Sequence, residues 1–151
     1  PQETVKGKWM ESNPENTPWF SATAYHFAQT IYKTLNVPVG IIVCSWGGSR
    51  VESWTNREIL ETYADIDLSK KGIEAVEEWK RPLVMYNGML KPLTNFTIKG
   101  FIWYQGESNV GKHEDYPVRF ARMVELWRKD RGLGNLPFYY AEIAPWIYGD
   151  G

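Results

Sequence analysis

The chain has 151 residues and a mass of 17.5 kDa, and 43% of its residues are hydrophobic, so it is long enough for one packed domain and too short for two. Its formal net charge is −1, from 17 basic and 18 acidic residues, and no basic block stands out, which argues against a nucleic-acid partner. The longest apolar runs, such as Val37–Trp46, are far shorter than the roughly 20 residues that a membrane span needs, so we expect no membrane insertion.

The N-terminal part of the chain is predicted to contain one helix and one strand. Residues 1–20 are predicted to be irregular, because glycine and proline interrupt a polar stretch. From Ser21 apolar residues recur every three or four positions, which predicts a helix that ends at Asn36–Pro38. Val39–Cys44 is a continuous, largely β-branched run, typical of a strand buried on both faces. The lone Cys44 excludes an internal disulfide and is interpreted as a small buried hydrophobic residue.

The middle of the chain is predicted to be mainly helical. A turn is predicted at Ser45–Ser49 from its two adjacent glycines, followed by a short helix over 55–63. Asp67–Lys80 is charged, with apolar residues at helical spacing, and is predicted to form one surface helix. Met85–Leu90 fits either a helical turn or a loop, and its pattern does not decide between them.

The C-terminal part is predicted to be a strand, a helix and a strand. The strands are expected at Ile98–Tyr104 and Pro137–Ile143, and the clearest helix at Asp115–Arg131, with Asp115 as its N-cap. Helices that alternate with strands imply parallel strands. The sequence therefore predicts a single α/β domain over 1–151, with a mostly parallel sheet and an irregular lead-in over 1–20.

Two polar, glycine-containing loops, Cys44–Arg50 and Gln105–Asn109, follow the first two predicted strands. In open parallel sheets ligands bind beyond the carboxyl ends of the strands, so these loops are predicted to form one wall of a small-molecule site. Gly47 and Gly48 allow consecutive backbone N–H groups to converge on an anion, as the oxyanion of acyl transfer requires. The alternative is a strand-to-helix turn that binds nothing.

The second loop carries side chains that suit the same chemistry. The amides of Gln105 and Asn109 can donate hydrogen bonds to an oxyanion. The carboxylate of Glu107 can hold a neighbouring loop or orient a partner group. The alternative is that these polar side chains only brace their own loop.

A nucleophile and a base are harder to find in this chain. Ser45 and Ser49 carry hydroxyls, but neither lies in a Gly-x-Ser-x-Gly elbow. His26 lies in the first predicted helix and is interpreted as structural, and His113 as an exposed residue. The cluster 113–115 lacks the spacing of a metal site, so no metal is predicted.

The aromatic content is high, with 8 Trp, 9 Tyr and 6 Phe. Most of these rings are expected in the core, among them Phe27, Phe101 and Phe138. Sugar rings have apolar faces that stack on indole, so tryptophans beside the polar loops favour a carbohydrate-related site. These tryptophans are Trp46, Trp54, Trp103 and Trp146.

Two stretches resemble conserved blocks of sialate O-acetylesterase-type carbohydrate esterases, which belong to the SGNH or GDSL-like hydrolases. Val37–Ser49 with Glu52–Trp54 resembles their second block, and Phe101–Asn109 resembles their third. Tyr86–Leu93 and the helix around 116–127 extend the similarity to most of the chain. The resemblance implies a three-layer α/β/α, flavodoxin-like fold, incomplete in this chain, and an acetylesterase that removes acetyl groups from sialic acid or related sugars without a cofactor.

The resemblance also implies which catalytic parts this chain holds. The nucleophile of these enzymes lies in an earlier Gly-Gln-Ser-Asn-like block and their histidine in a later Asp-x-His-like block, and neither block occurs between Pro1 and Gly151. We therefore expect an interior fragment that is inactive alone. The residues carried over are Gly48, Gln105 and the alternative Asn109 as oxyanion donors, Glu107 as site organiser, and Trp46, Gly47, Ser49 and Trp54 as substrate contacts.

The expected partners are an acetylated sugar and the missing parts of the chain's own domain, and an unpaired sheet edge favours self-association. A start at Pro1 rather than Met indicates an excised or processed piece, and the resemblance favours a periplasmic or secreted enzyme. Two alternatives stay open at this point: a non-catalytic sugar-binding module of the same fold, and a structural α/β domain whose loops only cap strands.

Overall fold

The computed structural model describes residues 2–145, so Trp146, which was expected beside the polar loops, lies outside the described residues. The chain divides into two compact units. Lys6–Ser45 forms the smaller unit, and residues 2–5 together with 46–145 form the described part of the larger one.

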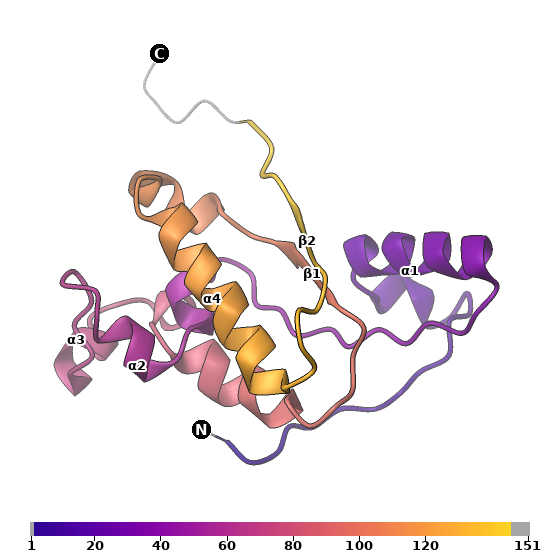
Figure 1. The fold of residues 1–151 in the computed structure, drawn as a ribbon, viewed down its shortest axis with the longest axis horizontal. Helices are drawn as coiled ribbons and strands as arrows, with labels where there is room; N and C mark the ends of the chain where they lie inside the picture. The colour runs from indigo at the N-terminus through magenta and orange to yellow at the C-terminus, as the bar shows by residue number, and fades with distance from the viewer. Residues whose placement is uncertain (1, 146–151) are drawn as a thin grey trace. The chain divides into compact units, whose positions relative to one another are not determined.

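The smaller unit is built on one helix, α1 (Ala22–Leu35) (Figure 1). Its N-cap is Ser21, whose hydroxyl accepts a hydrogen bond from the N–H of Ala24. It ends at Asn36, which takes a left-handed conformation with φ of 52°. The predicted helix and its end before Pro38 are thus confirmed. A short 3-10 turn, η1 (Thr17–Trp19), precedes it.

The strand predicted at Val39–Cys44 is wrong for this structure. These residues form no regular element among the described residues, and Val43 is 52% exposed. A strand needs a neighbour whose backbone groups complete its hydrogen-bond ladder, and the described sheet contains only two other strands. Two core predictions also differ, since Cys44 is only half-buried and Phe27 in α1 is exposed.

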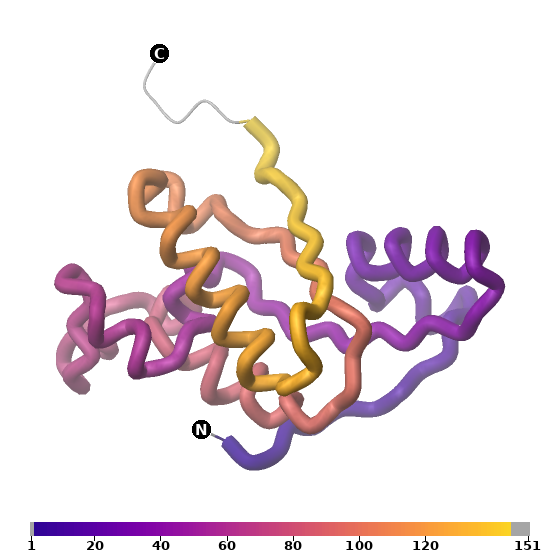
Figure 2. Tube along the Cα trace, in the orientation of Figure 1, coloured from indigo at the N-terminus to yellow at the C-terminus, as the bar shows by residue number. Residues whose placement is uncertain are grey.

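The larger unit contains a parallel two-stranded sheet. The strands are β1 (Phe101–Tyr104) and β2 (Phe138–Ala141), paired in register from Phe101 opposite Phe138 to Tyr104 opposite Ala141. Both are shorter than predicted, but the parallel pairing is confirmed. The trace in Figure 2 runs from β1 through a turn and back along α4 (Tyr116–Arg131) to β2.

Helix α4 packs on the sheet through aromatic rings. The ring centroids of Phe101 and Trp127 are 5.4 Å apart, and those of Phe120 and Phe138 are 5.6 Å apart. The helix ends at Gly132, where φ is +62°, as predicted from the glycines that follow it. Phe101 and Phe138 are accordingly half-buried at this helix–sheet contact.

The segment between the first loop and β1 consists of short helical turns. The predicted helix over 55–63 is present only as one turn, α2. The single helix predicted over Asp67–Lys80 is wrong: it is divided, because Arg81 Nε donates to the carbonyl of Val76 and Glu77 turns to ψ of 141°. The turns are η2 (Val51–Trp54), α2 (Arg57–Leu60), α3 (Lys70–Glu74), η3 (Glu78–Lys80), the π-helical η4 (Tyr86–Leu90) and η5 (Lys91–Leu93).

The core of the larger unit lies between these turns and α4. Val51, Leu60 and Met123 are fully buried there, and Trp54 is 2% exposed. The indole N–H of Trp127 donates to the carbonyl of Trp54 at 3.0 Å, which links α4 to η2. Among the helices of residues 2–145, none is long and apolar enough to cross a membrane.

Candidate functional site

The two predicted loops meet in the larger unit, and side chains of the second loop bind backbone groups of the first. The hydroxyl of Ser108 donates to the carbonyl of Gly48 at 2.7 Å, and Gln105 Nε2 donates to the carbonyl of Ser49 at 3.0 Å. In the other direction, the N–H of Val51 donates to Asn109 Oδ1 at 3.1 Å. These residues are 56 to 60 positions apart in sequence, so tertiary packing joins the loops.

Each loop has a glycine where its backbone geometry requires one. Gly48 has φ of +75°, and a Cβ there would lie 2.9 Å from Cδ1 of Trp79. A Cβ at Gly106 would lie 2.8 Å from Cγ2 of Ile143. After Gly106 the predicted loop becomes a 3-10 helix, η6 (Glu107–Lys112).

A buried carboxylate, Glu52, lies behind the two loops and is 2% exposed. Its Oε1 accepts a hydrogen bond from Arg119 Nη1 at 2.6 Å, and its Oε2 accepts one from Asn109 Nδ2 at 3.0 Å. Asn109 Oδ1 in turn accepts from Gln105 Nε2 at 2.8 Å. The side chains of both predicted amides are therefore tied to one buried ion pair between η2 and α4.

Arg119 also pairs with two carboxylates at the surface of the protein. Its Nη2 lies 2.7 Å from Asp65 Oδ1 and 3.0 Å from Asp115 Oδ2. Burial opposes the positive charge of Arg119, but the hydrogen bonds that Arg119 donates to Asp65 and Glu52 outweigh that effect and raise its pKa. Asp115 occupies the predicted N-cap position of α4, but its carboxylate pairs with Arg119 and makes no capping bond.

The predicted oxyanion donors differ in how free they are. Gly48 is exposed, and its N–H has no acceptor among residues 2–145. Gln105 Nε2 uses both hydrogens, one toward Ser49 and one toward Asn109. Asn109 is 2% exposed and lies inside the wall. In this arrangement the two amides join the loops, and the backbone of Gly48 presents the open donor.

Glu107, the predicted organiser, lies elsewhere. It is exposed, and its carboxylate makes no hydrogen bond or ion pair within the described part of the chain. Tyr116 is close enough for the charge of Glu107 to add to burial in raising the pKa of the phenol. The carboxylate that does connect the two loops is Glu52.

The predicted substrate contacts fall into two groups. Trp46 is 52% exposed and Gly47 is also exposed, so both are open to a ligand. Ser49 is buried, and its hydroxyl donates to the carbonyl of Trp46 and accepts from Trp54 Nε1. Trp54 is packed edge-on against Trp103 and Trp127, so no sugar can stack on it here.

The histidines lie apart from this network. His113 follows η6 and is exposed, as predicted. His26 lies on α1 in the smaller unit, is exposed, and contacts the ring of Tyr25 edge-to-face.

Sequence reasoning missed three residues of the site: Glu52, Arg119 and Trp79. A signal for Arg119 was present, because it lies one turn before Met123 on the buried face of α4, where a charged residue requires a partner. Trp79 is 43% exposed and contacts Gly48, although its sequence position predicts only a surface helix.

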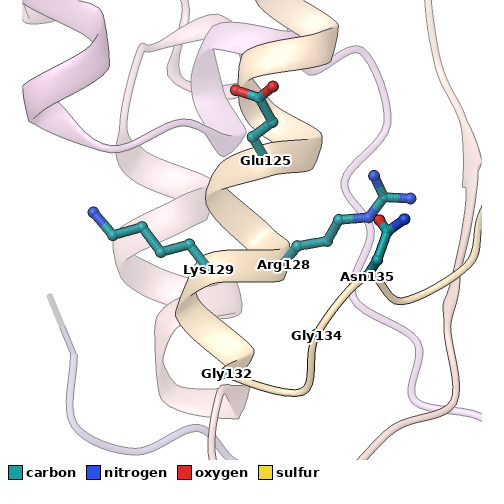
Figure 3. A pocket seen from close by; sticks show the side chains of 6 residues that line it. All are labelled: Glu125, Arg128, Lys129, Gly132, Gly134 and Asn135. Carbon is teal, nitrogen blue, oxygen red and sulfur yellow. The ribbon is translucent and has the colours of Figure 1, made fainter.

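A shallow, open hollow lies at the carboxyl end of α4, away from the residues that join the loops (Figure 3). Arg128, one of its residues, donates from Nε to the carbonyl of Leu136 and so holds the turn after the helix. None of the predicted site residues lines it. Its lining residues are Glu125, Arg128, Lys129, Gly132, Gly134 and Asn135.

Asp65 makes the stability of this network depend on pH. Burial alone would raise the pKa of its carboxyl, but hydrogen bonds from Lys112 and Arg119 outweigh burial and lower that pKa. A carboxyl with a lowered folded-state pKa stabilises the protein above its unfolded pKa of about 3.9 and loses this effect as the pH falls through the folded value.

We therefore expect wild type to be more stable than Asp65→Asn near neutral pH, and the difference to shrink below about pH 4. Urea unfolding of both proteins at a series of pH values measures it. A difference that does not change with pH would contradict this assignment.

The sequence was compared with known proteins. It matches the family model described as carbohydrate esterase, sialic acid-specific acetylesterase, over residues 12–148. It is 33% identical to the sialate O-acetylesterase of Homo sapiens over a 134-residue alignment that covers 85% of this chain and 26% of that protein. It is 28% identical to the sialate O-acetylesterase of Mus musculus, over an alignment that covers 87% of this chain and 31% of that protein.

A probable carbohydrate esterase of Arabidopsis thaliana is 33% identical over 48% of this chain and 31% of its own length. The chain therefore spans 26% to 31% of the length of these relatives.

Proposed function

The chain belongs to the carbohydrate esterase family of sialic acid-specific acetylesterases, and we propose that the protein that carries it hydrolyses O-acetyl esters of sialic acid or a related acetylated sugar. The observation that carries the proposal is the wall formed by residues 46–50 and 105–109, with the free N–H of Gly48 beside it. The proposal includes a three-layer α/β/α fold, of which β1, β2 and α4 would be one part.

The proposed mechanism is serine-type ester hydrolysis. A serine attacks the acetyl carbonyl, and the carbonyl oxygen becomes an oxyanion that needs preorganised donors. The N–H of Gly48 is the proposed donor. The two peptide units that follow this N–H are held in place, because Ser108 binds the carbonyl of Gly48 and Gln105 binds that of Ser49. Gln105 itself would donate to the oxyanion only by exchanging one of its present bonds.

The nucleophile and base are proposed to come from parts of the protein outside this chain. The hydroxyl of Ser49 is buried and already bonded to Trp46 and Trp54, so it has no path to an ester. We propose that a serine-type mechanism takes both its nucleophile and its base from other segments.

Two exposed indoles support a sugar as the alcohol part of the ester. Trp46 belongs to the same loop as Gly48, and Trp79 contacts Gly48 directly. A sugar ring stacked on either indole would bring its acetyl group near the N–H of Gly48. Exposed indoles of this kind are the only observation that favours a pure sugar-binding module as the alternative.

The test is acetate release from O-acetylated sialic acid, with p-nitrophenyl acetate as an ester that lacks a sugar. We expect the full-length protein to hydrolyse both and the isolated 151-residue chain to hydrolyse neither. Turnover by the isolated chain that vanishes with Ser49→Ala would contradict the proposal that the nucleophile lies elsewhere. Saturable tryptophan quenching by the sugar, without acetate release by the full-length protein, would favour the binding module.

A further inference from the structure

We infer that Glu52 is a positioning residue for the proposed esterase, because its buried carboxylate orients the amides of Asn109 and Gln105 and thereby anchors the carbonyl of Ser49, the residue that follows the proposed donor Gly48. The inference rests on the proposed function for its kinetic consequence. Its structural content, the orientation of two side-chain amides, stands without that function.

The orientation follows from which groups can accept hydrogen bonds. An ionised carboxylate only accepts, so Asn109 must turn its Nδ2 toward Glu52 Oε2, 3.0 Å away. Asn109 Oδ1 then faces the N–H of Val51 and Nε2 of Gln105, both of which donate to it. One buried acceptor thus determines which way the first amide points.

The second amide is oriented by the first. Because Asn109 Oδ1 can only accept, the Gln105 atom that faces it must be the donor Nε2, and the other hydrogen of Nε2 reaches the carbonyl of Ser49. Gln105 Oε1 lies 3.0 Å from the hydroxyl of Tyr116, which donates to it. The series of bonds from Arg119 through Glu52, Asn109 and Gln105 therefore ends on the carbonyl of Ser49, in the peptide unit that links Ser49 to Arg50, one residue after Gly48.

Glu52 suits this role because both of its oxygens are used. Arg119 Nη1 and Asn109 Nδ2 are two donors, and the carboxylate gives each its own oxygen. Both Glu52 and Arg119 are almost completely buried, so no water replaces a lost partner. Glutamine at this position has one acceptor oxygen for the two donors, so one of the two bonds must break.

The first test compares Glu52→Gln with Asp115→Asn in the full-length protein. Asp115 also pairs with Arg119, but its side chain is 59% exposed and does not bond to Asn109. We expect Glu52→Gln to lower kcat about 10- to 100-fold with little change in KM, because a misplaced donor affects the transition state more than substrate binding. Asp115→Asn should leave kcat unchanged.

A double-mutant cycle with Gln105→Ala separates positioning from a general loss of structure. If Glu52 acts through Gln105, adding Glu52→Gln to Gln105→Ala costs no further activity. Equal losses in the wild-type and Gln105→Ala backgrounds would overturn the inference.

An exchange of the two groups provides a variant that keeps every hydrogen bond. In Glu52→Gln/Asn109→Asp, the glutamine oxygen accepts from Arg119, its amide donates to the new carboxylate, and that carboxylate accepts from Val51 and Gln105. We expect kcat near the wild-type value, even if Glu52→Gln alone does not fold. A folded double variant with the low kcat of Glu52→Gln would overturn the inference.

Hydrogen exchange of the side-chain amide of Gln105, followed by NMR, measures the orientation of that amide and does not depend on esterase activity. Its protons should be protected in wild type and in the double variant, and exposed to exchange in Glu52→Gln. Unchanged protection in Glu52→Gln would overturn the inference. Absence of acetate release by wild type would instead contradict the proposed function.

Discussion

Replacing Arg119 by methionine is expected to lower the free energy of unfolding by about 3–5 kcal/mol, because it leaves a buried charge without its partner. The carboxylate of Glu52 is 2% exposed, and without Arg119 the one side chain of residues 2–145 that still donates to it is Asn109. Methionine fills a similar volume, so the loss of stability comes from the unpaired charge of Glu52 and not from a cavity. Asp65 and Asp115 also lose a partner, but water reaches both.

Two comparisons isolate that charge. Glu52→Gln/Arg119→Met removes both charges and keeps an acceptor for Asn109, so it should recover about half of the lost stability. Arg122→Met, one turn away on α4, should cost less than about 1 kcal/mol, because Arg122 is exposed and its main contacts are the Tyr63 ring and the Thr62 hydroxyl.

Urea unfolding of the full-length protein, followed by tryptophan fluorescence, measures these differences. Equal losses for Arg119→Met and Arg122→Met would show that the buried pair does not stabilise the fold as its geometry indicates.

The second large effect is expected at Gly48. We expect Gly48→Ala to lower kcat about 10²–10³-fold, the cost of losing one oxyanion donor. At φ of +75° an alanine is strained, and its Cβ would lie 2.9 Å from Cδ1 of Trp79, so the loop must move to accept it. Movement of the loop displaces the N–H that is proposed to bind the oxyanion.

Gly47→Ala is the matched comparison, since it changes the neighbouring residue in the same way. The φ of Gly47 lies outside the left-handed region, and an added Cβ there meets no atom within 4 Å. We expect Gly47→Ala to lower kcat much less than Gly48→Ala does, both on p-nitrophenyl acetate and on O-acetylated sialic acid. Equal losses at the two glycines would argue against Gly48 as a specific donor.

The helices that sequence predicted well are those with a local signal at both ends. Helix α1 has Ser21 at its N-cap and Asn36 at its end, and α4 ends at Gly132. The apolar spacing, caps and stops of each helix lie within one short stretch of sequence, so both helices can be predicted without knowledge of the fold. The segment Asp67–Lys80 does not form one helix: α3 already ends at Glu74, Glu77 leaves the helical conformation, and the side chain of Arg81 binds the carbonyl of Val76.

The meeting of the two loops was also predicted, but for a topological reason. Parallel strands end at the same edge of a sheet, so loops that follow them are placed together. In the structure, the hydrogen bonds of Gln105, Ser108 and Asn109 to the first loop agree with that expectation. The strand that was predicted before the first loop, Val39–Cys44, did not form, because no strand among the described residues pairs with it.

The sequence by itself determined the helices α1 and α4, the parallel α/β pattern, the family, and the two loops that carry Gly48 and Gln105, because each of these depends on residues close together in the chain. Only the tertiary structure decided how the loops are held. Glu52 and Arg119 are 67 positions apart, and a charged residue is more often exposed than buried. Their pairing depends on where α4 packs against η2, and no local pattern encodes that contact.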